Sequence, residues 1–264
     1  MSTHIAHLSS RALIRVTGPD ARPFLHNLLT QDVEGLAAGE LRFAALLSPP
    51  GRMLFDLFLL GQDEGVILDV AADRREALTQ RLAMYRLRAD VAIETLDSPV
   101  LAVWNGDVDG FIPDPRAAGL GGRRYDAKAT PDATELDWLA HQLAVGVPAS
   151  GDTIVDKTYP IEADLDLLHG IDFQKGCFVG QETTSRMWRR GAIRNRMLPI
   201  TFDGPPPAMG TEVLNGDLRA GEVMTGREGN AMALLRLDRL DGALTVEGRP
   251  VSVRRPAFLP ELTA

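Results

Sequence analysis

Residues 171–197 read IDFQKGCFVGQETTSRMWRRGAIRNRM, and this stretch concentrates the unusual features of the chain. It contains the only cysteine, Cys177, with Gly176 and Gly180 on either side. Glycine at both ends of a short segment indicates a turn in which the backbone approaches another group closely or takes a positive φ angle. Five arginines follow within eleven residues, in a chain whose net charge is -8: Arg186, Arg189, Arg190, Arg194 and Arg196. The sequence therefore predicts a special loop that leads into a local basic patch.

Composition limits the function classes. The 264 residues provide one large domain or two to three small ones, and 45% hydrophobic with 24% charged residues is typical of a globular protein. The acidic balance argues against nucleic-acid binding, and the apolar run at 53–60 is too short to span a bilayer. One cysteine excludes an intrachain disulfide and any self-sufficient cysteine metal site. The start MSTHIAHLSS lacks a signal-peptide pattern, so we expect a cytoplasmic, monomeric protein that binds no nucleic acid, membrane or resident metal.

The first hundred residues alternate strands and helices. We expect strands over 12–16, 42–47, 53–60, 66–70 and 91–95, because these runs are short and rich in β-branched and aromatic residues. Asp20 is a predicted N-cap for one helix, and Asp73 with Glu76 predicts a capping box for a second helix that carries Tyr85 on its apolar face. Asp56 is an acid inside an apolar strand. It either faces solvent on an alternating strand or faces a ligand.

The remaining residues predict a helix followed by a β-rich end. Thr134 is the expected N-cap of a helix that ends at Gly146 and Pro148. Five short strands then follow with Gly, Pro, Asn and Asp turns between them, at 198–202, 218–224, 231–237, 243–246 and 251–254. This spacing is typical of a small antiparallel barrel or sandwich.

Residues 175–182, KGCFVGQE, resemble the K-G-C-[YF]-x-G-Q-E signature of the YgfZ family of folate-binding proteins, relatives of the glycine-cleavage T-protein aminomethyltransferase. The resemblance extends to LIRVTGPDARPFLHNLLTQDV, GRMLFD and YPIEADLDLLHGIDFQKGC, and so covers nearly the whole chain. It implies an α+β, three-domain ring of the aminomethyltransferase folate-binding type, with a C-terminal antiparallel β-barrel. It also implies a tetrahydrofolate site in the middle and a role with iron–sulfur proteins or their assembly machinery.

The domain division implied by the resemblance is discontinuous. The first α+β domain comprises 1–48 and 98–196 and carries the KGCFVGQE loop. The second, a ferredoxin-like α+β domain, comprises 49–97 and begins at the breaker Ser48-Pro49-Pro50-Gly51. The barrel comprises 197–264.

The candidate catalytic residues lie in the KGCFVGQE loop. Cys177 lies near Lys175 and several arginines, and positive charge of this kind lowers a thiol pKa and favours the reactive thiolate. The alternative is that Cys177 is a small buried apolar residue. Lys175, Gln181 and Glu182 are further candidates, although Gln181 and Glu182 could equally be the first residues of a helix.

The candidate cofactor-binding residues lie in several segments. Glu162 resembles the T-protein glutamate that recognises the pterin, and a carboxylate suits adjacent ring N–H donors. Asp56 and Tyr85 are predicted to shape the site. Arg189 and Arg190 belong to a cluster that is either a solvated basic segment or an anion site, for the folate glutamate tail or for an acidic partner surface. The spacing of the cluster suits one side of a helix, but Gly191 makes a bend or an extended segment equally plausible.

The expected function is a tetrahydrofolate-binding accessory protein for the assembly, maintenance or repair of iron–sulfur proteins. T-proteins resemble this chain at GRMLFD but carry a second acid where this chain has Phe55. A paired carboxylate suits proton transfer at a reacting amine, so its loss weakens the case for aminomethyl transfer. Two alternatives stay open, and with them whether the protein is an enzyme: a folate-dependent one-carbon transferase and a non-catalytic adaptor with a vestigial folate site.

Overall fold

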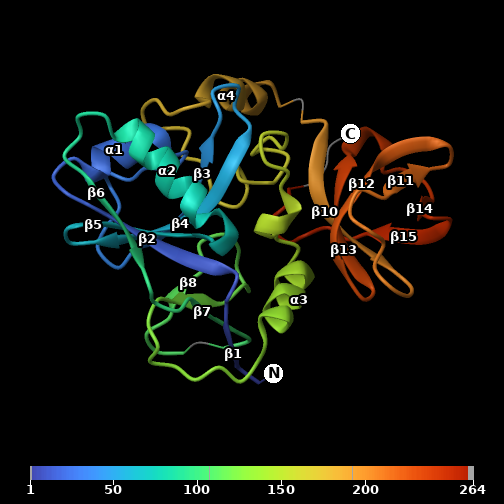
Figure 1. Cartoon of the computed structure of the whole chain (residues 1–264). Helices are drawn as coiled ribbons and strands as arrows, with labels where there is room; N and C mark the ends of the chain where they lie inside the picture. Colours follow the sequence, from blue (N-terminus) through green and yellow to red (C-terminus); the bar gives the residue numbers. More distant parts are fainter. Residues whose placement is uncertain (1, 107, 192, 261–264) are drawn as a thin grey trace.

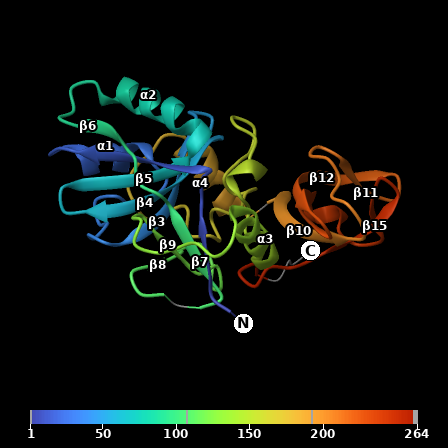
Figure 2. The same cartoon turned by 60° about the horizontal axis from the view of Figure 1, so that its bottom comes forward.

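The computed structural model describes residues 2–106, 108–191 and 193–260. Figure 1 shows two sheets with their helices on one side of the molecule and a β-barrel on the other. Helix α3 (Glu135–Val145) lies between the sheets and the barrel in this view and after a 60° turn (Figure 2). No helix in the described ranges is long and apolar enough to cross a membrane.

The larger sheet has five strands in the order β3-β4-β5-β2-β6. They are β2 (Arg11–Thr17), β3 (Leu41–Leu47), β4 (Met53–Gln62), β5 (Gly65–Ala71) and β6 (Ala92–Leu96). Side chains alternate across the sheet, so Leu57 and Leu59 pack beneath α1 (Ala21–Leu28) and α2 (Arg75–Arg86), whereas Phe58 and Leu60 face the opposite core. Burial of both faces explains why β4 reads as a nearly continuous apolar run.

The predicted boundary between residues 48 and 49 falls inside this sheet. Strands β3 and β4 pair from Leu41 opposite Leu60 to Leu47 opposite Met53, and β2 pairs with β5 and β6. Residues assigned by sequence to two different domains therefore share one hydrogen-bonded sheet. The three-part division stays a prediction. A division that follows the sheets would instead keep β2 to β6, which lie within residues 11–96, in one unit.

The smaller sheet has the order β1-β7-β9-β8, with β1 (His4–His7), β7 (Leu101–Trp104), β8 (Ile112–Pro113) and β9 (Gly122–Arg124). Helix α3 packs on it through Trp138, whose ring makes an edge contact with Trp104 at 5.8 Å between ring centres. The expected start of α3 is confirmed, because the Thr134 hydroxyl accepts a hydrogen bond from the Asp137 N–H. The expected end is also confirmed, since Gly146 is left-handed with φ +93°.

Of two predicted helix starts, one agrees with the structure, since Asp20 is the N-cap residue of α1. Asp20 precedes α1 but its side chain makes no capping hydrogen bond, and its carboxylate accepts from the Asp90 N–H instead. The capping box at Asp73 is wrong, because residues Ala72–Arg74 form a short 3-10 turn, η1, and α2 begins at Arg75. Because the 3-10 turn comes first, the N-cap position of α2 falls at Arg74, so Asp73 and Glu76 are not placed to form a capping box.

The barrel is closed by six antiparallel strands in the order β10-β13-β12-β11-β14-β15. Their bounds are β10 (Asn195–Phe202), β11 (Glu212–Asn215), β12 (Leu218–Arg227), β13 (Asn230–Arg236), β14 (Leu244–Val246) and β15 (Arg249–Val253), with a 3-10 turn η3 at Leu237–Arg239. Strand β11 was not predicted, because its four residues, EVLN, offer little apolar pattern.

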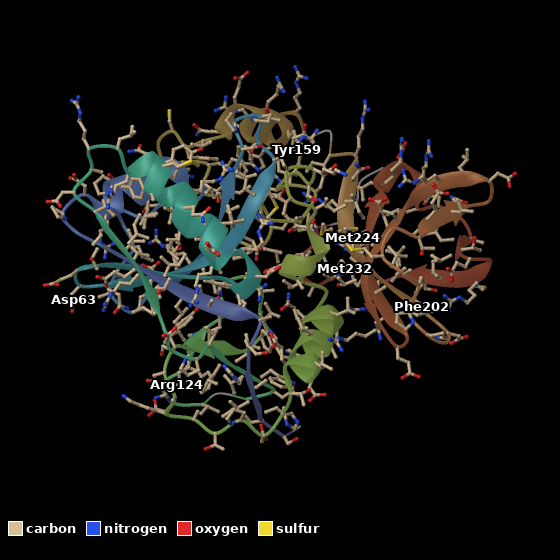
Figure 3. The ribbon with its side chains drawn as sticks, viewed as in Figure 1. Asp63, Arg124, Tyr159, Phe202, Met224 and Met232 are labelled. Carbon is tan, nitrogen blue, oxygen red and sulfur yellow. The ribbon has the colours of Figure 1, made fainter. Side chains whose placement is uncertain are left out.

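The barrel joins the rest of the molecule through an apolar interface. Figure 3 shows Met224 and Met232 on the side of the barrel that faces the sheets. Both are buried in the core that contains Phe58 and Leu143. Methionine suits such a junction because its flexible side chain fills irregular gaps.

Candidate functional site

A cavity of about 570 Å³ lies where the larger sheet, α3 and the barrel meet. Its apolar walls include Leu54, Phe55, Trp138, Leu139 and Leu143. Its polar lining comes from the two sheets and their connections, from α3, from the 3-10 turns η1 and η2 (Ser150–Asp152) and from β12: Arg11, Asp56, Asp73, Arg74, Arg116, Arg123, Glu135, Gln142, Ser150, Asp152, Thr225 and Arg227. A mostly apolar cavity with a few convergent polar groups is typical of a small-molecule site.

A buried ion network supports the cavity around Asp69. The Asp69 carboxylate accepts from Arg11 Nε at 2.6 Å through one oxygen and from Arg123 Nη1 at 2.9 Å through the other. Tyr125 donates its hydroxyl to the same carboxylate at 3.2 Å. Burial, together with the Asp69 charge, raises the pKa of the Tyr125 phenol well above its ordinary value, so the phenol stays a donor.

Arg123 extends the network to Asp114. Arg116 forms a two-pronged ion pair with Asp114, and Arg123 Nε lies 3.3 Å from the same carboxylate. Burial alone would raise the pKa of the Asp114 carboxyl, but the charges and hydrogen bonds of Arg116 and Arg123 outweigh it and lower the pKa to about 2. The Arg123 guanidinium also lies 3.8 Å from the centre of the Phe58 ring. These contacts fix the cationic side of the cavity.

Asp56 lies in the cavity wall, which is the ligand-facing alternative of the two that the sequence left open. One carboxylate oxygen accepts from the Ser150 hydroxyl at 2.6 Å and lies 3.9 Å from Arg11 Nη1. Nearby Asp152 is almost fully buried, accepts from the backbone N–H of Thr225 in β12 at 2.9 Å, and so ties η2 to the barrel. Burial raises the pKa of Asp152.

Arg74 and Arg227 line the cavity from η1 and β12, and sequence reasoning missed both. Neither forms an ion pair with a residue that the structure describes. Arg74 Nε is buried without a hydrogen-bond partner among these residues, although Nη2 donates weakly to Leu54 O at 3.4 Å. Cations of this kind are suited to an anionic group. Each is an ordinary surface-type arginine in sequence, so no local signal marks them.

The KGCFVGQE loop forms a second candidate site on the surface, apart from the residues that line the cavity. Cys177 is exposed, so the alternative of a buried apolar cysteine is wrong. Gly180 has φ +81°, and a Cβ there would lie 2.6 Å from Ser48 O and 2.9 Å from Gly51 Cα. The turn between β3 and β4 therefore packs backbone to backbone against the loop. This contact explains why the two distant segments each contain glycine.

Replacing Gly180 by Ala is expected to lower the free energy of unfolding by about 1–3 kcal/mol, because the change adds both left-handed strain and a backbone clash. Gly176 provides the matched control in the same loop. A Cβ at Gly176 would meet only His26 Nε2, at 3.9 Å, so Gly176→Ala should change stability by about 0.5 kcal/mol or less. Urea unfolding checks both variants, and equal losses would contradict the locked-loop geometry.

Lys175 has a structural role that the sequence did not reveal. Its ammonium donates to the carbonyl oxygens of His26 and, at 2.8 Å, Leu29, which are the free carbonyls at the end of α1. Burial lowers the pKa of Lys175 to about 8 despite the acids around it. Lys175 therefore anchors the loop to α1. The catalytic role predicted for Lys175 stays a prediction.

Gln181 and Glu182 are the first residues of α4 (Gln181–Arg190), which confirms the alternative that they begin a helix. Gln181 still touches the loop, since its Nε2 donates to Gly176 O at 3.4 Å. The arginine segment is helical up to Arg190, and Gly191 ends the helix in a left-handed conformation. The predicted chemical roles of Gln181 and Glu182 are not tested by this geometry.

Of the five predicted cofactor residues, only Asp56 lines the cavity. Tyr85 lies on α2 against the helix-side core. The Glu162 carboxylate accepts from the Tyr159 N–H at 3.1 Å and from Asn195 Nδ2 at 2.8 Å, so both of its oxygens are engaged within the protein. Arg189 and Arg190 lie on the outer side of α4, so a folate tail would have to leave the cavity to meet them.

Comparison with known proteins agrees with this architecture. The model of the "CAF17, C-terminal beta-barrel domain" matches residues 194–261. The aminomethyltransferase T of the glycine cleavage system from Bartonella henselae superposes with a TM-score of 0.77 at 19% identity, covering 97% of this chain and 86% of that one. The predicted fold class, aminomethyltransferase-like with a C-terminal antiparallel barrel, is therefore confirmed.

Two relatives extend over most of the chain. The mitochondrial iron–sulfur cluster assembly factor IBA57 of Mus musculus is 32% identical, covering 91% of this chain and 79% of its own length. The human protein of the same name is 31% identical, covering 93% and 82%. These relatives are mitochondrial, so the expectation of a cytoplasmic location is wrong. It rested on the lack of a signal-peptide pattern and of a bilayer-spanning run, together with the single cysteine, and these features do not distinguish the cytoplasm from the mitochondrion.

Proposed function

This chain belongs to the IBA57 family of iron–sulfur cluster assembly factors, and we propose that it is a tetrahydrofolate-binding accessory protein for the assembly, maintenance or repair of iron–sulfur proteins. The observation that carries the proposal is the exposed Cys177 on a loop held rigid by the Gly180–Gly51 contact. An exposed thiol on a rigid loop contributes little to packing but is accessible for chemistry with a partner.

Cys177 is proposed to act as a reactive thiol or as a ligand shared with a partner. Within the described ranges no group of three or more His, Cys, Asp or Glu side chains lies close enough together to hold a metal ion. Iron–sulfur clusters are held by several thiolates, so one cysteine requires further ligands from elsewhere. The natural source is the iron–sulfur protein or assembly protein that receives or delivers the cluster.

The cavity residues fit a reduced folate. The volume of about 570 Å³ lies within the usual range for a drug-sized ligand, and Phe55 and Trp138 offer flat apolar surface to a ring. The Asp56 carboxylate would accept hydrogen bonds from pterin N–H groups. Arg74 and Arg227 would hold the carboxylates of the glutamate tail. When bound, the folate would supply a carrier for a one-carbon unit.

One feature of the cavity argues against aminomethyl transfer. Phe55 is buried beneath the Arg74 guanidinium, 5.0 Å from it, where T-proteins carry the second acid of the GRMLFD-like segment. An aromatic ring leaves Asp56 as the single carboxylate of that segment in the cavity wall. We therefore favour a binding role for Asp56 over proton transfer.

Replacing Asp56 by Asn is expected to weaken tetrahydrofolate binding about tenfold or more, because a charge-assisted hydrogen bond contributes about 1.5–3 kcal/mol. Asp73→Asn is the matched control, since Asp73 also lines the cavity but is exposed and makes no ion pair with the described residues. Calorimetry on the wild type and both variants makes the comparison.

Two outcomes of this calorimetry would contradict the proposal. If Glu162→Ala lost tenfold in tetrahydrofolate affinity and Asp56→Asn lost none, the pterin would have to bind at Glu162 and not in the cavity. Absence of tetrahydrofolate binding by the wild type would select the adaptor with a vestigial site.

A further inference from the structure

Helix α4 presents an outer face whose groove is lined, among the residues that the structure describes, by side chains of α4 alone. Residues at alternating intervals of one and three line a shallow groove along this face: Gln181, Glu182, Ser185, Arg186, Arg189 and Arg190. The inner face holds buried Thr184 and the neighbouring Thr183, whose Cβ lies 3.0 Å from the position of a Cβ on Gly51. Figure 1 shows α4 at the outer edge of the molecule, beyond the ends of β3 and β4.

The charge on this face is unbalanced. Arg186, Arg189 and Arg190 form no ion pair with any residue in the described ranges, although the chain as a whole is acidic. Arg186 lies three and four residues before the other two, so like charges lie next to each other along the helix, which is unfavourable. The helix dipole favours Arg189 and Arg190 in the last turn but gives Arg186 less support. A partner that brought carboxylates to this face would relieve the repulsion.

The face is continuous with the Cys177 loop. The Gln181 N–H donates to Phe178 O at 3.2 Å, and the Gln181 side chain reaches Gly176. On the loop side of α4, Trp188 is 47% exposed and stacks on Phe173, with ring centres 4.2 Å apart and planes at 12°. An exposed tryptophan beside unpaired arginines has the composition of an interface hot spot.

We propose that the outer face of α4, with Trp188 beside it, is the docking surface for an acidic segment of the protein whose cluster chemistry involves Cys177. This proposal depends on the proposed function in one respect: the partner that docks on α4 is taken to be the protein that meets Cys177. Planar guanidinium groups grip carboxylates with two hydrogen bonds, and Trp188 supplies apolar contact area. Because α4 begins at Gln181, four residues after Cys177, docking on α4 brings the partner's cluster-binding groups toward Cys177.

A protein partner fits this surface better than a nucleic acid. The basic area is limited to one ten-residue helix on a chain of net charge -8, which repels an extended phosphate backbone. Glu182 lies in the same groove. One side of the Trp188 ring is already covered by Phe173, which leaves less surface for base stacking.

The test begins with a photo-cross-linking amino acid, benzoylphenylalanine, placed at Ser185 in the full chain expressed in its own cells. A second chain carries it at Arg81 on α2 as the positional control. Proteins captured only at position 185 are identified by mass spectrometry, and the identified protein is purified for binding measurements. We expect a protein with an acidic surface segment.

Charge-reversal variants then measure the contribution of the face. Arg186→Glu with Arg189→Glu should weaken binding of the identified protein about tenfold or more at 0.05 M salt, and the difference should shrink at about 0.5 M salt. Arg81→Glu with Arg88→Glu changes the net charge by the same four units, two for each exchange, and should leave the affinity within about twofold. Docking should persist in Cys177→Ser, which separates this surface from the thiol chemistry.

Three results would overturn the docking surface: equal weakening by both double variants, no protein captured at 185 above the level at 81, or capture that nuclease treatment abolishes. The last result would assign the face to a nucleic acid. None of them would bear on Cys177 itself; full complementation by Cys177→Ser would instead count against the proposed function.

Discussion

Replacing Asp69 by Asn is expected to lower the free energy of unfolding by about 3–5 kcal/mol, a large fraction of the stability of a typical domain. The Asp69 carboxylate is 1% exposed and is the shared partner of Arg11 and Arg123. Neutralising it leaves buried Arg11 with only the distant Asp56, at 3.9 Å, and buried Arg123 with only Asp114, which Arg116 also shares. The cavity wall that includes Arg11 and Arg123 should loosen with it, so tetrahydrofolate binding should weaken in the same variant.

Asp126→Asn is the matched control for this prediction. Asp126 also pairs with an arginine, Arg124, but its side chain is 41% exposed, and solvent-exposed ion pairs contribute little to stability. Urea unfolding at pH 7 measures both variants. If Asp69→Asn lost no more stability than Asp126→Asn, the buried network would not be the support of the cavity.

Sequence reasoning succeeded where the signal is local. The Thr134 cap and the Gly146 end of α3 were predicted because both are fixed by residues within a few positions of each other. The C-terminal barrel was predicted from regularly spaced short strands, and only β11 was missed. The glycines around Cys177 correctly indicated a special turn, since Gly180 is left-handed.

The ion network and the free cations of the cavity could not be predicted in this way. Arg11 and Asp69 are 58 positions apart, and Arg123 and Asp69 are 54 apart, so their pairing depends on tertiary structure alone. Arg74 and Arg227 come from a 3-10 turn and a barrel strand that meet only in the folded molecule. Periodicity describes which side of an element is buried, but it does not say which other element covers it.

The domain boundary at residue 48 stays a prediction, but the turn at that position shows a second limit of local signals. Ser48-Pro49-Pro50-Gly51 is rich in turn formers and was taken to separate domains, but it is the tight connection between two paired strands, β3 and β4. Proline and glycine mark a change of chain direction in both cases. The distinction between a hairpin turn and a linker requires knowing that the flanking strands pair.

Replacing Cys177 by Ser is expected to remove the biological activity of the protein while leaving its fold intact. Cys177 is exposed, so the exchange of sulfur for oxygen should change stability by about 0.5 kcal/mol or less. Serine keeps the size of the side chain but supplies neither a thiolate nucleophile nor a soft ligand for iron. Gln174→Ala is the matched control, because Gln174 is exposed in the same loop and only its backbone N–H is bonded, to Asp172.

Complementation of a strain that lacks the gene, read out as the activities of its iron–sulfur enzymes, tests the central claim most directly. The wild type and Gln174→Ala should restore these activities, and Cys177→Ser, expressed at the same level, should leave them at the level of the uncomplemented strain. Full restoration by Cys177→Ser would show that the exposed thiol is dispensable and would contradict the proposed function.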